Sequence, residues 1–109
     1  MWECGSCGYI WDGDEPPDRC PKCNAKKERF TKLEDKAMEL VVRSRYTNSL
    51  HMHLYSLLEQ VVDMADEGVD DNLDPGCVKI FKKAVNQAEV LQQSIKAELQ
   101  GHVKKGKWG

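Results

Sequence analysis

Apolar residues recur at three- and four-residue steps along most of the chain after residue 31. The first series, which includes three polar members, runs Leu33, Ala37, Leu40, Val41, Ser44, Asn48, His51, Tyr55, Leu58, Val62 and Ala65. This spacing places side chains on one face of an α-helix. Thr31 followed by Glu34 has the Ser/Thr-x-x-Glu pattern of a capped helix start. The pattern predicts a helix at about residues 32–66.

A second helix is predicted after an acidic break at residues 67–73, where Gly68 is suited to end the first helix. Asp74 followed by Pro75 is typical of a helix start. The second apolar series is Cys77, Phe81, Ala84, Ala88, Leu91, Ile95 and Leu99. We expect a helix at about 75–103, an antiparallel hairpin because the break is short, and a frayed tail that leaves Trp108 unplaced.

The two helices carry more apolar side chains than one seam can bury. The surplus consists of Val42, Leu54, Leu57, Val61, Val78, Val85 and Val103. Pairing of two hairpins into a four-helix bundle is the simplest way to cover these side chains. We therefore expect a homodimer that forms through the helices.

Residues 1–30 lack helical periodicity and contain several glycines and prolines, which favours loops and short strands. The expected apolar cover is Trp2, Tyr9, Ile10, Trp11 and Phe30. Because this segment is too short to hold a hydrophobic core unaided, a bound metal should supply much of its stability. We divide the chain into a metal-binding domain at 1–30 and a two-helix hairpin at 31–109.

Four of the five cysteines lie in the first domain: Cys4, Cys7, Cys20 and Cys23. They form two Cys-x-x-Cys pairs separated by twelve residues. Two such pairs can enclose one ion in a tetrahedral cage of sulfurs, which suits zinc or a single iron ion. Two disulfides are the alternative, but paired Cys-x-x-Cys spacing is typical of a metal site.

The residue after each pair supports a metal-binding turn. Gly8 and Asn24 follow the two pairs, and both residue types tolerate the positive φ that such a turn needs. The turn would direct backbone N–H groups at the sulfurs, and hydrogen bonds to thiolate sulfur help to set the reduction potential of an iron centre.

The segments WECGSCGYIW at 2–11, Gly13, EPP at 15–17 and CPKC at 20–23 resemble the short rubredoxin-type domain of rubrerythrins. The resemblance implies one iron per chain, bound by the four cysteines and cycling between Fe(III) and Fe(II), with zinc as a possible substitute. It covers about residues 1–30, and the hairpin resembles no family firmly. In rubrerythrins this domain usually follows the helices, and many rubredoxins have glycine where this chain has Asn24.

Charge is distributed unevenly although the net charge is only −2. Residues 46–78 contain seven acids and no Lys or Arg, whereas residues 79–109 contain seven lysines and two acids. We expect no nucleic-acid binding, because the first domain is near neutral and the middle of the chain is acidic. We expect no membrane span either, because no apolar run approaches the roughly eighteen residues that a span needs. We expect a cytoplasmic protein, because Met1 lies too close to Cys4 for a targeting peptide.

The helices contain two further candidate sites, at His51 and Cys77. No glutamate has a histidine three residues later, so the usual di-iron motif of four-helix bundles is missing. His51 interrupts an apolar face and could bind a metal with its mate in a dimer, or serve as a hydrogen-bonded core residue. Cys77 lies in the first turn of the second helix, where the dipole could activate its thiol; Asp74 opposes this, and a small core residue is the alternative.

These features favour an electron-transfer protein that serves redox protein partners, such as a peroxide- or oxygen-defence system suggested by the resemblance. We predict no catalytic residue, no organic cofactor and no independent enzyme activity. One alternative is a zinc-ribbon interaction module on a helical dimer. Another is a divergent, ferritin-like dimeric metal oxidase.

Overall fold

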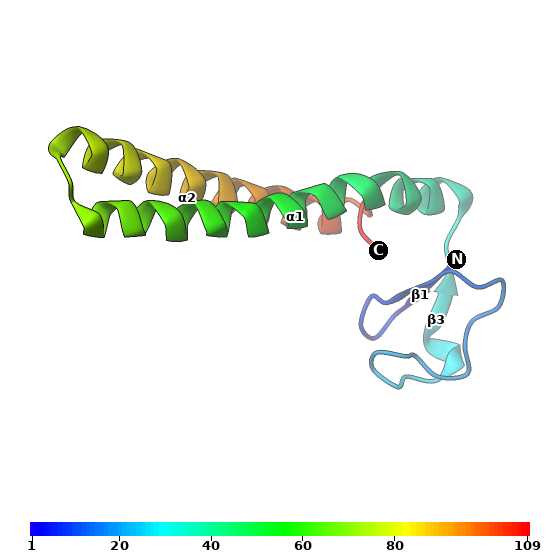
Figure 1. Cartoon of the computed structure of the whole chain (residues 1–109). Coiled ribbons are helices and arrows are strands. Elements are labelled where there is room, and N and C mark those ends of the chain that lie inside the picture. The colour runs from blue at the N-terminus through cyan, green and yellow to red at the C-terminus, as the bar shows by residue number, and fades with distance from the viewer. The chain divides into compact units, whose positions relative to one another are not determined.

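The structure, a computed structural model, describes all residues from 1 to 109. In chain order its elements are β1 (Trp2–Cys4), β2 (Ile10–Trp11), the 3-10 helix η1 (Lys27–Arg29), β3 (Phe30–Lys32), α1 (Asp35–Asp71) and α2 (Pro75–Lys104) (Figure 1). The predicted fold class, a small β domain followed by a helical hairpin, is confirmed.

The chain forms two units by internal contacts. One consists of residues Met1–Arg45 together with Gly106–Gly109, and the other of Tyr46–Lys105. Helix α1 begins in the first unit and continues through the second. Neither helix has a stretch that is both long enough and apolar enough to cross a membrane.

A three-stranded antiparallel sheet organises the first unit, with strand order β2-β1-β3. The central strand β1 pairs Trp2 with Trp11 on one side and Cys4 with Phe30 on the other. Because β1 ends at Cys4, the sheet delivers the first cysteine directly into the turn that follows.

The predicted start of the first helix is wrong by a few residues. Thr31 does not cap a helix: it lies in β3 and pairs with Glu3 of β1. The first helix begins at Asp35, and its first turn is closed by the bond from the Met38 amide to the Glu34 carbonyl, at 2.9 Å. Strand pairing engages the backbone at Thr31, so the helix can form only after the sheet has ended.

The predicted end of that helix is also wrong. Gly68 lies inside α1, and the helix continues to Asp71 rather than stopping at residue 66. A Cβ atom at Gly68 would lie 2.4 Å from carbon atoms of the Phe81 ring, so glycine is needed there for the two helices to approach. The helix ends at Asp71, and the next residue, Asn72, has a φ of 49°, the left-handed conformation that asparagine tolerates.

The predicted start of the second helix at Asp74 and Pro75 is confirmed. The Asp74 carboxylate accepts a hydrogen bond from the Cys77 amide at 2.8 Å, and Pro75 occupies the first turn. The helix ends at Lys104, one residue later than expected. Gly106 then takes a positive φ of 70°, which lets the chain turn out of the helix.

The helices of the second unit run side by side and bury a narrow apolar seam (Figure 1). Its centre consists of Leu58, Ala88 and Ile95, with the partly buried Tyr55, Val62 and Leu99 packed against it. Two residues of the predicted helical faces are misplaced: Leu40 of α1 and Leu91 of α2 are exposed. The neighbouring Gln92 is half-buried instead and donates from Nε2 to the Tyr55 carbonyl at 3.4 Å.

Candidate metal centre

Two tight turns, one after β1 and one before η1, present the four cysteines in pairs. In the first turn the Gly8 amide donates to the Cys4 carbonyl at 2.8 Å. In the second the Asn24 amide donates to the Cys20 carbonyl at 2.9 Å. Gly8 has a φ of 74° and Asn24 a φ of 61°. The predicted positive φ after each pair is therefore confirmed, and asparagine serves in place of glycine.

The four sulfur atoms converge on one point. The Sγ atoms of Cys4 and Cys23 are 3.7 Å apart, as are those of Cys7 and Cys20. All four lie within 4.8 Å of one another, and none forms a disulfide. A tetrahedral ion with metal–sulfur bonds of about 2.3 Å requires sulfur–sulfur distances of about 3.8 Å. The spacing fits a metal ion and is far too long for a disulfide bond.

Backbone amides of the turns are directed at three of the sulfurs, those of Cys4, Cys7 and Cys20. Burial raises the pKa of the Cys4 thiol, but hydrogen bonds from the Ser6 and Cys7 amides reverse this and leave that pKa below its usual value. Burial likewise raises the pKa of Cys20, and amides two and three residues later bring it down to about 7. These amides stabilise thiolate, which is the form that binds a metal.

The raised pKa of Cys7 indicates that the four-cysteine cluster favours a bound cation. The Tyr9 amide lowers the pKa of the Cys7 thiol, whereas burial and the three neighbouring cysteines raise it, to about 12. The crowded sulfurs therefore cannot all carry a negative charge on their own. A bound cation would remove this repulsion, so the donor set fits a metal ion.

The exposure of the four cysteines is uneven. Cys4 and Cys20 are buried, at 0% and 3% exposure, and pack with Phe30 into a small apolar cluster. Cys7 is half-buried and Cys23 is exposed. The centre therefore has a covered side toward the sheet and an open side at the second turn.

Most of the predicted apolar cover is present. Trp2, Tyr9 and Trp11 pack against the cluster, and Ala25, which the sequence did not suggest, joins them. Ile10 is not part of this cover. Successive strand residues point to opposite faces of the sheet, so Ile10, between Tyr9 and Trp11, is turned away from the sulfurs.

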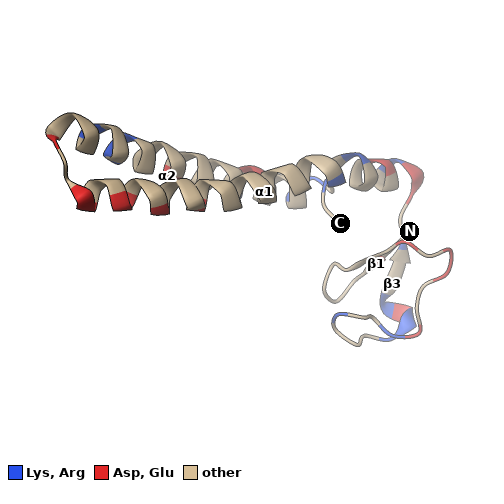
Figure 2. Cartoon of the chain, viewed as in Figure 1, with Lys and Arg blue, Asp and Glu red and all other residues tan.

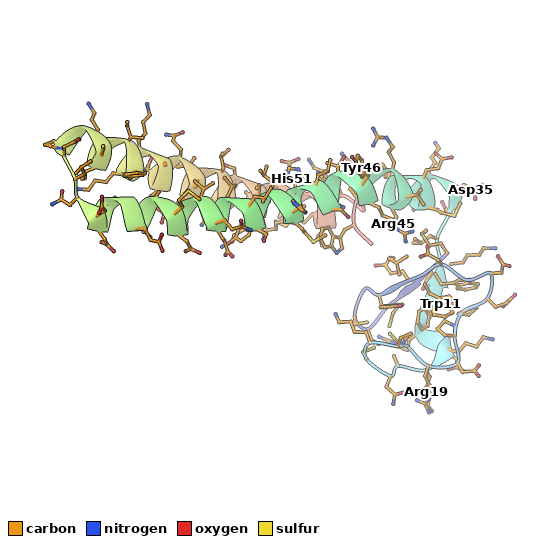
Figure 3. The ribbon with its side chains drawn as sticks, in the orientation of Figure 1. Trp11, Arg19, Asp35, Arg45, Tyr46 and His51 are labelled. Carbon is orange, nitrogen blue, oxygen red and sulfur yellow. The ribbon has the colours of Figure 1, made fainter.

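Two indole rings anchor the loop between the cysteine pairs. Trp2 donates from Nε1 to the Asp14 carbonyl at 3.1 Å. Trp11, which is labelled in Figure 3, donates from Nε1 to the Glu15 carbonyl at 2.9 Å. A Cβ atom at Gly13 would lie 2.3 Å from Nε1 of Trp11, so only glycine lets the loop pass this close. The tryptophans thus fix the loop as well as cover the centre.

The residues after α2 return to the first unit, which corrects the expectation of a frayed tail. Arg45 donates from Nε to the Gly109 carbonyl at 2.6 Å and forms an ion pair with Asp12 at 2.9 Å. A Cβ atom at Gly109 would lie 2.3 Å from Ile10, so the backbone of the tail lies directly against β2. Trp108, which belongs to the same unit, is 38% exposed.

Comparison with known proteins identifies the N-terminal segment. Residues 2–31 match the family model described as "Rubrerythrin, rubredoxin-like domain". Reverse rubrerythrin-1 of Clostridium acetobutylicum is 41% identical over 34 residues, which cover 31% of this chain and 19% of that protein. Rubrerythrin of Clostridium perfringens is 56% identical over 23 residues, which cover 21% of this chain and 12% of that protein.

These matches confirm the resemblance seen in the first thirty residues and define the segment as a rubredoxin-like domain. The matched segment spans less than a fifth of the length of either curated relative. No solved structure matches the chain. The helical remainder is not named by any of these comparisons.

Within one chain, His51 does not belong to a second group of converging metal ligands. The four cysteines are the only group of three or more possible ligands whose donor atoms converge. His51 lies on α1 (Figure 3), with its ring edge-on to that of His102 and 6.2 Å between the centroids. His102 is the hydrogen-bonded histidine: its Nδ1 lies 2.6 Å from Oδ1 of the buried Asn48, and its Nε2 lies 3.2 Å from a Glu98 oxygen.

No pattern in the sequence singles out His102. It lies 54 residues from Asn48, so only the register of the hairpin brings the two together. A polar residue within the apolar face of α1 was the one available signal, since buried polar groups need a partner.

The surroundings of Cys77 disfavour an activated thiol. A hydrogen bond to Asp74 raises its pKa most, and burial and the charges of Asp74 and Asp71 raise it further. The dipole effect considered from the sequence is thus outweighed. Cys77 is half-buried near the start of α2, which fits the alternative of a small packing residue.

Proposed function

We propose that this chain is an electron carrier that holds one iron ion through Cys4, Cys7, Cys20 and Cys23. The observation that carries the proposal is the set of four converging sulfurs with backbone amides directed at them, in a segment that matches the rubredoxin-like family. When bound, the iron would supply a single-electron couple between Fe(III) and Fe(II). Hydrogen bonds to the sulfurs are one means by which a protein tunes such a couple.

The chain itself holds the four sulfurs in fixed positions and shields two of them from water. Cys4 is fixed by the end of β1, and its amide is bonded to the Tyr9 carbonyl at 2.9 Å. The amide of Cys20 is bonded to the Ala25 carbonyl, also at 2.9 Å. Such backbone bonds hold the sulfurs in place whatever their charge, and little movement is what rapid electron transfer requires.

The exposed second turn is the proposed contact for redox partners. Cys23 is exposed, and Lys22 next to it is exposed as well. Arg19 and Lys26 face each other across an isolated bridge, and Arg19 donates from Nη1 to the Asn24 carbonyl at 3.3 Å. A basic turn beside an open sulfur suits a partner with an acidic surface, because opposite charges speed encounter.

The biological setting is part of the proposal. By resemblance to rubrerythrins, the partner would belong to a peroxide- or oxygen-defence system, and this chain would supply electrons without itself being the enzyme. A reducing compartment such as the cytoplasm suits five cysteines that form no disulfide.

Metal content and colour test this proposal. Protein purified from iron-replete native cells should contain one iron per chain and show visible thiolate-to-Fe(III) absorption. Dithionite should bleach this absorption and air should restore it. A colourless protein with one zinc per chain would contradict the proposal and favour the zinc-ribbon interaction module.

Matched variants assign the observed absorption to the cage. Cys20→Ser should abolish the visible absorption, whereas Cys77→Ser should leave it intact because Cys77 lies in the other unit.

A charge reversal in the second turn tests the partner contact. Lys22→Glu should slow reduction by an acidic redox protein, most strongly at low ionic strength. Glu28→Gln, an exposed change outside this turn, serves as the control.

A further inference from the structure

The hairpin of the second unit has two open faces that differ in character. On α1 the half-buried and buried residues facing α2 include His51, Tyr55, Leu58 and Val62. Each residue is turned about 100° from the next around the helix axis. The residue before each inward one therefore points to one open side, and the residue after it points to the other.

The same rule applies to α2, whose inward residues include Phe81, Ala88 and Ile95. Because the two helices run antiparallel, stepping back by one residue turns both helices toward the same side of the hairpin. The two "preceding" sets thus share one face, and the two "following" sets share the other.

The face formed by the preceding residues, which we term the apolar face, carries a single charged residue, Glu98, which precedes the inward Leu99 at one end of the face. Its other members are Leu50, Leu54, Leu57, Val61 and Met64 from α1 and Ile80, Ala84, Gln87, Leu91 and Ser94 from α2. Seven of these are large apolar residues with exposures between 41% and 70%. Nothing within the chain covers them.

The opposite face is polar and largely acidic on α1. It consists of Met52, Ser56, Glu59, Asp63 and Asp66 from α1 and Lys82, Asn86, Glu89, Gln93 and Lys96 from α2. Met52 is its one apolar member. The contrast between the faces shows that the exposed apolar residues are gathered on one side rather than scattered, as isolated surface residues would be.

We propose that the apolar face binds the same face of a second copy of this chain, forming a four-helix bundle with the two α1 helices antiparallel. The inference goes beyond electron transfer and does not depend on which metal is bound. The apolar face is about 21 Å long from Leu50 to Met64 and two helices wide, on the order of 400 Å² in projection. Protruding side chains raise its accessible area toward the roughly 800 Å² that each partner buries in a standard interface.

Charge along α1 selects the antiparallel orientation. Between Glu59 and Asp71 the helix carries six acids and no base (Figure 2), and none of the six forms an ion pair within the chain. Two parallel α1 helices would place these acidic segments side by side, which is unfavourable. Antiparallel helices separate them.

The row of α1 residues in the apolar face ends in opposite charges, which would pair between two antiparallel copies. Continued at the same three- and four-residue steps, the series Leu50 to Met64 reaches Arg43 through Thr47 at one end, and Asp71 through Gly68 at the other. Both charged residues lie fourteen positions from Leu57. An antiparallel pair centred on Leu57 therefore brings Arg43 of each copy opposite Asp71 of the other, and both residues are exposed and unpaired within one chain.

The first test is the mass of the metal-loaded full chain in solution. The chain has a mass of 12.4 kDa, and light scattering should give twice that value. Leu57→Asp should weaken dimerisation about a hundredfold or more, because it places two like charges at the centre of an apolar interface. Met52→Asp is the matched control, since Met52 is similarly exposed but lies on the opposite face, and it should leave the dimer intact.

The second test is a charge swap that reports orientation. Arg43→Glu and Asp71→Lys should each raise the dimer dissociation constant about three- to tenfold, because each removes two symmetry-related ion pairs. The double variant should restore the wild-type constant. Far-UV circular dichroism checks that every variant keeps its helices.

Three results would overturn the proposal. A monomer mass for the wild type at high micromolar concentration would mean that the apolar face receives a different protein. A dimer that survives Leu57→Asp but not Met52→Asp would place the interface on the other face. A parallel dimer would show instead as little change in Arg43→Glu, because that change replaces one pair of facing like charges with another.

Discussion

The two units of this chain are stabilised by different kinds of interaction. In the first, two cysteine-bearing turns and a three-stranded sheet bury only Cys4, Cys20 and Phe30 as a cluster, and the sulfurs repel one another unless a cation neutralises them. In the second, two long helices bury a seam centred on Leu58, Ala88 and Ile95. The first unit therefore depends on a ligand and the second on packing, so they should fail under different perturbations.

Removing the metal should have the largest effect, and it should affect only the first unit. Apparent binding free energies of structural zinc sites reach about 10–16 kcal/mol, more than so small an apolar cluster can replace. All three tryptophans lie in the first unit, so their fluorescence reports on it alone. In Cys20→Ser, or after chelation, this fluorescence should shift to the unfolded value while helical ellipticity at 222 nm changes little.

Survival of the native tryptophan emission without metal would show that the apolar cluster alone folds the first unit. Cys77→Ser is the control, because it removes a thiol outside the cage. It should bind metal as the wild type does.

Ile95→Ala should act on the hairpin and spare the metal centre. Ile95 is 5% exposed in the helical seam, and truncation of such a residue costs about 2–5 kcal/mol through lost burial and a residual cavity. Urea unfolding followed at 222 nm measures the loss. Val90→Ala, at a residue that is 54% exposed, should change stability by less than about 0.5 kcal/mol. Loss of bound metal in Ile95→Ala would contradict the separation of the two units.

Gly68→Ala should destabilise the hairpin, although alanine is the better helix former. At an unobstructed helix position the change would stabilise by about 1 kcal/mol. Here the new methyl group meets the Phe81 ring, and overpacking of this kind costs about 1–3 kcal/mol. Thermal unfolding of the single variant and of Gly68→Ala/Phe81→Leu separates the two effects, because the smaller side chain should recover the loss.

The smallest effect concerns the cap of α2. The pKa of Asp74 is lowered, mainly by the hydrogen bond from the Cys77 amide. The carboxylate therefore stabilises the fold above its unfolded pKa of about 3.9, and this contribution is lost as pH falls through the lower folded value. Asp74→Asn can still cap the helix, so it should lower the thermal midpoint by only a few degrees at pH 7, and the difference should vanish on strong acidification.

The same variant tests the state of Cys77. Because Asp74 is the largest cause of the raised Cys77 pKa, the thiol should react faster with a disulfide reagent at pH 8 in Asp74→Asn than in the wild type. Equal rates would mean that Asp74 does not control this thiol.

Local patterns were sufficient where the physics is local. Positive φ at Gly8 and Asn24 follows from the turn that each Cys-x-x-Cys pair must make. The cap at Asp74 follows from its place just before the helix, where its carboxylate can accept a hydrogen bond from a backbone amide of the first turn. The same approach failed at Thr31, where a correct capping pattern was outcompeted by pairing with Glu3, a residue far away in the sequence.

Gly68 and Leu91 illustrate the second limit. Glycine suggested a helix end at residue 68, but the approach of Phe81 from the other helix is the reason for it. Leu91 and Gln92 are neighbours, and hydrophobicity favoured Leu91 for the seam. The register of the hairpin placed Gln92 there and gave it the Tyr55 carbonyl as a partner.

The amino-acid sequence alone determined the metal-binding turns, the rubredoxin-like character of residues 2–31, and the existence of two antiparallel helices. Those features depend on spacing and on backbone conformations that a few neighbouring residues impose. Only the tertiary structure decided where α1 begins and ends, that His102 partners Asn48, and that Arg45 joins the tail to Asp12. Each of these depends on residues that are distant in sequence, whose meeting is set by the packing of whole elements.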